Sequence, residues 1–309
     1  MKSFIIKKNE NDQRIDKFLK KALPKLSSDL IYKYIRLKKI KVNGKRTLPS
    51  YKLVLEDKID VYLNDDIVAN ETKKNDFLLA KKQLEVIYED KNIIIVNKPV
   101  NVTVQDDDSK NPDTLNNRLL LYLYQKKEWD YLVQTTFTPA FVHRLDRNTS
   151  GLIIAAKNVE SSRILSEKIK NREIEKYYIC KVHGIVEPKQ GVLKDWWTKK
   201  EDNFVTVSKK PLNMNSKEII TEYKLLAHKN NVSLLQIHLI TGRTHQIRAH
   251  MYFFNHPLLG ERKYTNIAEK NDGEYQFLFS YKIIFNFKQN NGILEYLKNK
   301  ELSLPIPKF

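Results

Sequence analysis

Residues 143–156 read HRLDRNTSGLIIAA. In this stretch Arg144 and Arg147 flank Asp146, and the apolar run that follows predicts a buried strand. A carboxylate between two guanidinium groups stays ionised, so Asp146 is suited either to nucleophilic chemistry or to a structural ion pair. Taken alone, these residue types favour the structural ion pair. The decision between the two depends on the rest of the chain.

The residues around this stretch contain more strand-like runs than helical ones, and the strands often follow one another. That order predicts an α+β fold with a central mixed, mainly antiparallel sheet flanked by helices. We expect helices at 115–124 and 161–170, and strands at 84–88, 93–97, 177–182, 219–226, 232–240 and 277–287.

The first 70 residues have a different pattern. Residues 14–26 carry apolar side chains at helical spacing with Pro24 near the end, and Ser27-Ser28-Asp29 can cap a second helix to Leu37. Asn43-Gly44 indicates a tight hairpin turn, and residues 52–63 read as strand interrupted by a turn. The polar residues 64–76 lack periodicity. We therefore predict a small α+β unit at 1–70, a linker at 71–80 and a larger unit at 81–309.

Composition indicates a globular chain that attracts polyanions. The 309 residues carry a formal net charge of +18, and residues 1–75 hold half of it, with 19 Lys and Arg against 10 Asp and Glu. Such a field favours nucleic acid, although a Lys-rich solvated surface would have the same composition. No apolar run approaches the roughly 20 residues of a membrane span, and the N-terminus lacks a signal-peptide core. We expect a cytoplasmic protein without a membrane partner.

Three further segments contain candidate site residues. Residues 241–250 read TGRTHQIRAH; Asn97-Lys98-Pro99 follows a strand-like run; and Lys176-Tyr177-Tyr178 begins another. Alone, the second is typical of a turn and the third of a core tyrosine. His245 and His250 are five residues apart and therefore not on one helical face, and the single Cys180 excludes a Cys-rich zinc site. We expect no metal.

Together and in this order, the segments resemble the RluA-type family of pseudouridine synthases, which modify ribosomal and some transfer RNAs. The signature runs unbroken from His143 to Leu152, and the resemblance covers residues from about 80 to the C-terminus. The N-terminal residues resemble the small RNA-binding module named after ribosomal small-subunit protein four, the S-four domain. This module often precedes the catalytic domain in enzymes that act on large-subunit ribosomal RNA.

The resemblance implies a role for each matching residue. Asp146 matches the catalytic aspartate, Tyr178 the active-site tyrosine and Arg248 the arginine that pairs with the aspartate. Arg144 matches a residue that helps displace the target base from its stack. The remaining residues of the matched motifs are expected to contact RNA or the base; they are His143, Lys98, Arg243 and His245.

The chain departs from the family pattern at a few positions. Asn101 and Asn255 stand where the family usually has Gly, and Glu261 stands where it usually has Asp. Val100 follows Pro99 where a small residue is usual, and Gln105-Asp106 replaces a usual His-Pro pair. None of these positions belongs to the matched catalytic set, so the expected chemistry is unaffected.

The implied reaction moves the uracil base from its nitrogen to its carbon 5 attachment on the ribose. It changes no oxidation state and adds no group, so we expect no cofactor. The carboxylate of Asp146 could attack carbon 6 of the base or act near carbon 1′ of the ribose. Tyr178 could stack on the uracil and help remove the carbon 5 proton. Because a stacked base is out of reach, the target should be flipped out.

Two other functions remain open. A non-catalytic RNA-binding or ribosome-assembly factor would use Asp146 structurally. The same chemistry could instead act on transfer RNA, although the N-terminal module favours ribosomal RNA. We expect a monomer, because no residue pattern marks an interface.

Overall fold

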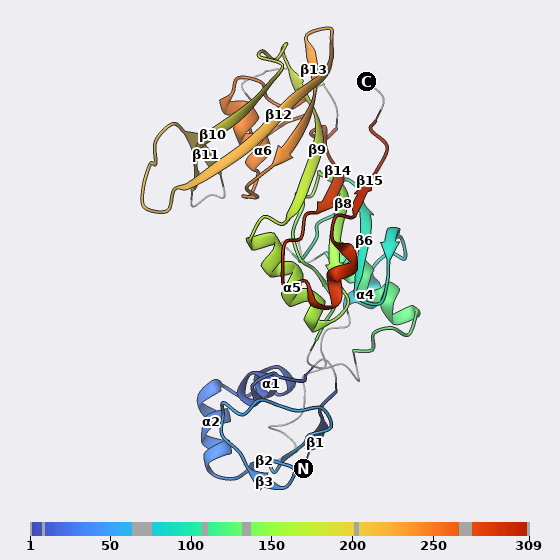
Figure 1. The fold of residues 1–309 in the computed structure, drawn as a ribbon, viewed down its shortest axis with the longest axis vertical. Helices are drawn as coiled ribbons and strands as arrows, with labels where there is room; N and C mark the ends of the chain where they lie inside the picture. The colour runs from blue at the N-terminus through green and yellow to red at the C-terminus, as the bar shows by residue number, and fades with distance from the viewer. Residues whose placement is uncertain are drawn as a thin grey trace.

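Two folded units are distinct along the chain (Figure 1). The computed structural model describes residues 2–7, 10–63, 76–106, 111–131, 137–200, 204–265 and 274–307. Half of the expected linker, residues 71–75, lies outside these residues. Its described end forms a 3-10 helix, η1 (Asp76–Leu79), whose Phe77 packs into the core of the larger unit.

The N-terminal unit is a four-stranded antiparallel sheet, in the order β1-β4-β2-β3, with two helices packed against it. Helix α1 ends at Ala22, four residues earlier than expected, because Pro24 lacks the N–H that another turn requires. Asn43 and Gly44 both have positive φ, which confirms the predicted hairpin turn. The elements are β1 (Lys2–Ile5), α1 (Ile15–Ala22), α2 (Ser28–Arg36), β2 (Ile40–Val42), β3 (Lys45–Arg46) and β4 (Lys58–Val61).

The larger unit is built on one extended sheet, in the order β11-β10-β12-β13-β9-β14-β8-β6-β5, with β15 beside β14 and β7 beside β8. Of the described pairings only β8 with β14 is parallel, which confirms the expected mixed, mainly antiparallel α+β fold. Its strands are β5 (Glu85–Glu89), β6 (Ile93–Lys98), β7 (Ala140–Phe141), β8 (Ser150–Ala156), β9 (Ile174–His183), β10 (Gln190–Lys199), β11 (Val205–Ser208), β12 (Lys217–Lys229), β13 (Val232–Leu239), β14 (Leu278–Phe285) and β15 (Glu301–Ser303).

Helices cover part of this sheet. They are α4 (Leu115–Gln125), α5 (Val159–Lys170), α6 (Gln246–Phe253) and the 3-10 helix η2 (Gly292–Leu297). Sequence patterns did not predict α6, β10 or β11. The run of α6 mixes polar and apolar residues over only eight positions, so its period is ambiguous. β10 buries Asp195 among its apolar residues, which obscures the alternation of a strand.

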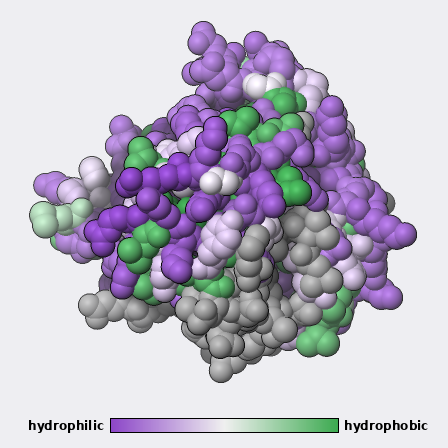
Figure 2. All heavy atoms as spheres, turned by 90° about the horizontal axis from the view of Figure 1, so that it is seen from below, coloured by the Kyte–Doolittle hydropathy of each residue, from purple (hydrophilic) through white to green (hydrophobic). Residues whose placement is uncertain are grey.

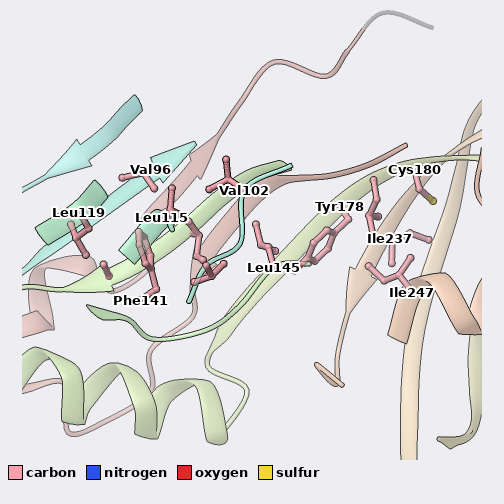
Figure 3. Close-up of a cluster of buried hydrophobic side chains, with 14 of the residues drawn as sticks. Val96, Val102, Leu115, Leu119, Phe141, Leu145, Tyr178, Cys180, Ile237 and Ile247 are labelled. Carbon is pink, nitrogen blue, oxygen red and sulfur yellow. The ribbon is translucent and has the colours of Figure 1, made fainter. Parts of the chain in front are cut away.

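The largest hydrophobic cluster connects the two halves of the long sheet. It runs from Val96 on β6 and Leu119 on α4, past Leu145, to Tyr178 on β9 and Ile247 on α6 (Figure 3). Leu145 precedes Asp146 and is buried, whereas Arg144 and Arg147 on either side are exposed. The buried leucine therefore anchors the loop that carries Asp146 to the core.

Figure 2 shows the face of the molecule seen from the end at which the N-terminal unit lies in Figure 1. Hydrophilic side chains dominate this face, and hydrophobic ones are scattered among them. Among the described residues, no helix has both the length and the apolar composition that crossing a bilayer requires.

Gly151 allows the parallel contact between β8 and β14. Its φ is +109°, and a Cβ at this position would lie 2.1 Å from the carbonyl oxygen of Ser280. Gly151→Ala should therefore abolish soluble folded protein or lower the free energy of unfolding by at least about 3 kcal/mol. Gly44→Ala is the control, since Gly44 also has positive φ but has open space around it, so the cost is about 1 kcal/mol. Urea unfolding measures the free energy of unfolding of both variants. Equal losses in the two variants would contradict a steric clash at Gly151.

Candidate active site

A cleft of about 650 Å³ lies where three segments distant in sequence meet. Asp146 comes from the loop between β7 and β8, Tyr178 from the middle of β9 and Arg248 from the first turn of α6. The volume is within the range of cavities that hold small ligands, and a nucleotide is of that size. His143, Arg144, Arg243 and His245 also line the cleft.

Arg248 joins two carboxylates. Its Nη1 donates to Asp146 Oδ2 at 3.0 Å, while Nε and Nη2 each donate to Glu261 at 2.7 Å. The Glu261 side chain is fully buried, whereas that of Asp146 remains about a quarter exposed to the cleft. Although burial opposes ionisation, the hydrogen bonds and charge of Glu261 raise the pKa of Arg248. The guanidinium is therefore permanently charged and held in one orientation, with one N–H directed at Asp146.

Backbone hydrogen bonds fix the Glu261 carboxylate that orients Arg248. Its Oε1 accepts from the backbone N–H groups of Arg262, Lys263 and Tyr264. Burial acts against the carboxylate, but Arg248 and these N–H groups lower the pKa of Glu261 below its ordinary value. Glu261 stands where the family usually has Asp, and the longer side chain still grips the guanidinium with both oxygens.

Tyr264 is buried next to Arg248 and His245. The Arg248 guanidinium lies 5.5 Å from its ring centroid, and its hydroxyl is 2.8 Å from His245 Nδ1. His245 Nε2 is 3.9 Å from Asp146 Oδ2, which is longer than a hydrogen bond. Burial lowers the pKa of His245 despite the nearby charge of Asp146, so its neutral form is favoured. Among the described residues, Arg248 is thus the cation that contacts Asp146.

Tyr178 lies at the floor of the cleft. It is 4% exposed and belongs to the same hydrophobic cluster as Leu145 and Ile237 (Figure 3). Burial raises the pKa of Tyr178, an effect that the neighbouring Ser280 hydroxyl only partly offsets. The side chain is therefore a neutral phenol near pH 7, and its ring offers a flat apolar surface to a base.

Lys98 does not reach the cleft, which contradicts the expectation that it contacts RNA. Its side chain is completely buried, and Nζ donates to the carbonyl oxygens of Pro99, Arg147 and Thr149 at 2.8–2.9 Å. Burial lowers the pKa of Lys98 to about 7, although the charge of Asp146 opposes this. Two of the three acceptors are in the loop that follows Asp146, so Lys98 positions that loop from behind.

The other residues that were expected to contact RNA differ in how far they are exposed. Arg144 and Arg243 are exposed at the cleft. The Nε2 of His143 accepts from the backbone N–H of Ile154, and burial lowers the pKa of His143 to about 3. His143 is therefore a neutral side chain that ties the loop to β8, and that nitrogen is already engaged.

A buried polar network fixes α6 against the sheet. Gln246 Nε2 donates to Thr221 Oγ1 at 3.0 Å, and Thr221 Oγ1 is 2.9 Å from His250 Nδ1. His250 Nε2 is in turn 3.0 Å from Asp195 Oδ2. Because the Thr221 hydroxyl has no other acceptor among the described residues, we assign its proton to the bond with Nδ1, so Nε2–H donates to Asp195. Gln246 and His250 are thus anchored, and Arg248 lies between them.

Two departures from the family pattern preserve the backbone conformation. Asn101 and Asn255 have φ of 59° and 65°, in the left-handed region that glycine occupies most easily. Asn tolerates this region better than other side chains. The turns after Pro99 and after α6 are therefore retained without glycine.

Sequence reasoning assigned no role to Glu261 or Tyr264. Both lie in the segment that follows α6, and Glu261 was noted only as a departure from the family pattern. Glu261 lies 13 residues after Arg248 in the sequence. That separation is too long for the ion pair between successive helical turns that a sequence pattern can reveal. The turn at 257–260 brings Glu261 back onto α6, and that contact depends on the tertiary fold.

Glu261→Gln tests the carboxylate behind Arg248. We expect a loss of about 2–4 kcal/mol in the free energy of unfolding at pH 7, because a buried guanidinium loses a charged partner. Since the pKa of Glu261 is lowered in the folded state, its contribution is full above pH 4.5 and is lost as the pH falls further. The difference in the free energy of unfolding between wild type and Glu261→Gln, measured with urea, should therefore decrease below pH 4.5. Glu218→Gln, at an exposed pair with Lys194, should change stability by less than about 0.5 kcal/mol.

Two protein families match parts of this chain. Residues 92–252 match the model of the RNA pseudouridylate synthase family, and residues 13–59 match that of the S4 domain. An uncharacterized RNA pseudouridine synthase of Mycoplasma capricolum is 36% identical over 97% of this chain and 96% of its own length. Ribosomal large subunit pseudouridine synthase C of Buchnera aphidicola is 33% identical over 84% and 79%.

Solved structures show the same fold. Human RNA pseudouridylate synthase domain containing 1 aligns with a TM-score of 0.58 and 20% identity, over 73% of this chain and 84% of that one. The family match extends over more than half of this chain, and it includes the segments that contribute Asp146, Tyr178 and Arg248 to the cleft. The chain therefore belongs to the RluA-type family of RNA pseudouridine synthases, and it carries an S4 domain at its N-terminus.

Proposed function

We propose that this pseudouridine synthase acts on specific uridines of large-subunit ribosomal RNA, with Asp146 as its nucleophile. The observation that carries the catalytic part is the Asp146–Arg248 pair, 3.0 Å apart in a cleft floored by Tyr178. The choice of RNA is supported by the names of relatives, which include ribosomal large subunit pseudouridine synthases C and D. The S4 domain and the basic N-terminal segment also support it.

The proposed chemistry needs only side chains on the cleft wall. The carboxylate of Asp146 attacks the base at carbon 6 or acts at the ribose near carbon 1′. The N1–C1′ bond breaks, the base turns, and a C5–C1′ bond forms. Any bond that Asp146 has made to carbon 6 or carbon 1′ then breaks, which restores the carboxylate. The proton on carbon 5 leaves and N1 gains one, so atoms balance without cofactor or metal. Arg248 holds the carboxylate in place throughout.

Tyr178 and Arg144 have separate tasks in this proposal. The buried phenol of Tyr178 stacks on the detached uracil and limits its rotation. Because the pKa of Tyr178 is raised, its neutral hydroxyl is better suited to hydrogen bonding than to taking the carbon 5 proton directly. Arg144 is exposed at the cleft, where it can occupy the space in the stack that the flipped base leaves. Arg243 and His245 line the same cleft and contact the nucleotide.

The decisive experiment is a conversion assay with competing RNAs. Purified protein is mixed with unmodified large-subunit RNA or with unmodified transfer RNAs, without nucleotide or redox cofactor, and pseudouridine is mapped. We expect one or a few converted positions in the large-subunit RNA. Conversion of transfer RNA alone would contradict the ribosomal assignment, and no conversion of any RNA would instead favour the ribosome-assembly alternative.

The proposal also includes the domain boundaries, the compartment and the oligomeric state. The RNA-binding unit comprises residues 1–70, and the catalytic unit comprises residues 81–309. The enzyme acts in the cytoplasm as a monomer with RNA as its partner. Its binding should weaken steeply with salt, because Lys and Arg contacts to phosphates release counterions.

A further inference from the structure

Lys176 lies in the cleft and has no role in the chemistry described so far. It precedes Tyr178 by two residues on β9, so both side chains project from the same face of the sheet. Its Nζ is 3.9 Å from the position that a Cβ on Gly242 would occupy, and its charge helps lower the pKa of His143. Lys176 is therefore bounded by the Asp146 loop on one side and the 241–243 loop on the other.

The ammonium group of Lys176 has no hydrogen bond or ion pair with any residue that the structure describes. Asp146 is the one carboxylate among the described residues lining the cleft, and Arg248 already pairs with it. Burial lowers the pKa of Lys176, which means that the charged form lacks a compensating partner. A partly buried cation in a cleft open to ligand is a site for an anion.

The charges along the cleft identify that anion. Lys170, the last residue of α5, and Arg172 line the same cleft as Lys176, and both are exposed. Uracil and ribose are both neutral, so the formal negative charges of a flipped nucleotide are on its flanking phosphates. A lysine ammonium binds phosphate as a point charge and does not need a particular orientation of the group.

We propose that Lys176 Nζ binds a non-bridging phosphate oxygen of the flipped nucleotide, and that Arg172 and Lys170 guide the adjoining strand at the cleft mouth. The proposal deepens the proposed function, since it assumes that the target uridine enters this cleft. The contact fixes the ribose relative to Asp146 and Tyr178 while the base is free to turn. Lys176 is thus a substrate-binding residue that is distinct from the basic contacts of the S4 domain.

The test combines a charge removed from the enzyme with a charge removed from the RNA. Substrates are the shortest RNA that wild type converts and versions with a single neutral methylphosphonate on the 5′ or 3′ side of the target uridine. Enzymes are wild type, Lys176→Met, Lys176→Arg and Lys282→Met. Lys282 is the matched control, because it lies over the ring of Tyr177 on the opposite face of the sheet. The measurement is single-turnover kcat/KM.

We expect wild type to lose about 10- to 100-fold with one of the two methylphosphonates, the loss typical of a charge-assisted hydrogen bond. Lys176→Met should lose a similar factor on unmodified RNA and lose little more on that methylphosphonate. Lys176→Arg should recover most of the activity, and Lys282→Met should behave as wild type. Such non-additivity identifies a direct contact.

Two results would overturn the proposal. If wild type is indifferent to both methylphosphonates, no phosphate contact exists, whatever the folding of the variants. If the losses from Lys176→Met and the methylphosphonate multiply, Lys176 acts on the base or on the fold instead. Since any RNA that wild type converts can be used, failure of the ribosomal assignment leaves this test intact.

Discussion

Asp146→Asn should reduce the single-turnover rate of pseudouridine formation by about 10⁴-fold or more, the scale on which loss of a nucleophile acts. The amide has nearly the same shape as the carboxylate and can still accept a hydrogen bond from Arg248. The cleft should therefore remain intact while the charge and nucleophilicity are lost. The measurement is a rate with enzyme in excess over the RNA that wild type converts.

Two controls separate chemistry from binding and folding. Glu167→Gln removes a carboxylate from the exposed surface of α5 and should leave the rate within about twofold of wild type. The affinity of Asp146→Asn for unmodified RNA, measured at fixed salt, should stay within about threefold of wild type. Full activity in Asp146→Asn would remove it as the nucleophile, and a parallel loss of affinity would assign it to RNA binding.

Arg248→Met should have the second largest effect. We expect a loss of about 10²- to 10³-fold in rate and about 3–5 kcal/mol in the free energy of unfolding, because the carboxylates of Asp146 and Glu261 lose the cation between them. Single-turnover kinetics and urea unfolding at pH 7 measure the two losses.

Arg248→Lys should recover little of either loss. Three different guanidinium nitrogens contact the two carboxylates, and one ammonium group cannot reproduce that fork. Arg163→Met, on the exposed side of α5, is the matched control and should leave rate and stability near wild type. A fully active Arg248→Lys enzyme would show that charge alone is required at this position.

The residues that we propose as catalytic could be recognised in the sequence because each belongs to a continuous motif. Asp146 is recognised within a ten-residue signature, and Tyr178 and Arg248 within two shorter segments. The same motifs were misleading for Lys98, because its segment matches the family yet its ammonium group is directed at backbone carbonyls and away from the cleft. A motif match identifies the residue type at a position, but it does not show which groups that side chain contacts.

The contacts that hold the site together could not be predicted. Glu261 and Tyr264 reach Arg248 and His245 only because the turn after α6 folds back over that helix. The Asp195–His250 pair joins a strand to a helix across 55 residues, on an element that sequence patterns did not show as a strand. Such pairings follow no short sequence period, since they depend on which faces of the sheet and helices are buried together.

For Asp146, the sequence by itself determined the residue type, its flanking arginines and its family. It also determined the α+β class, through strand-like runs whose period reflects the alternation of buried and exposed side chains. Tertiary structure alone decided that Glu261 orients Arg248 toward the carboxylate, that Lys98 lies behind the loop, and that Lys176 faces the cleft without a partner among the described residues. The physical reason is that hydrogen bonding and desolvation act over a few ångströms in space, between groups such as Asp146 and Arg248 that lie about a hundred residues apart along the chain.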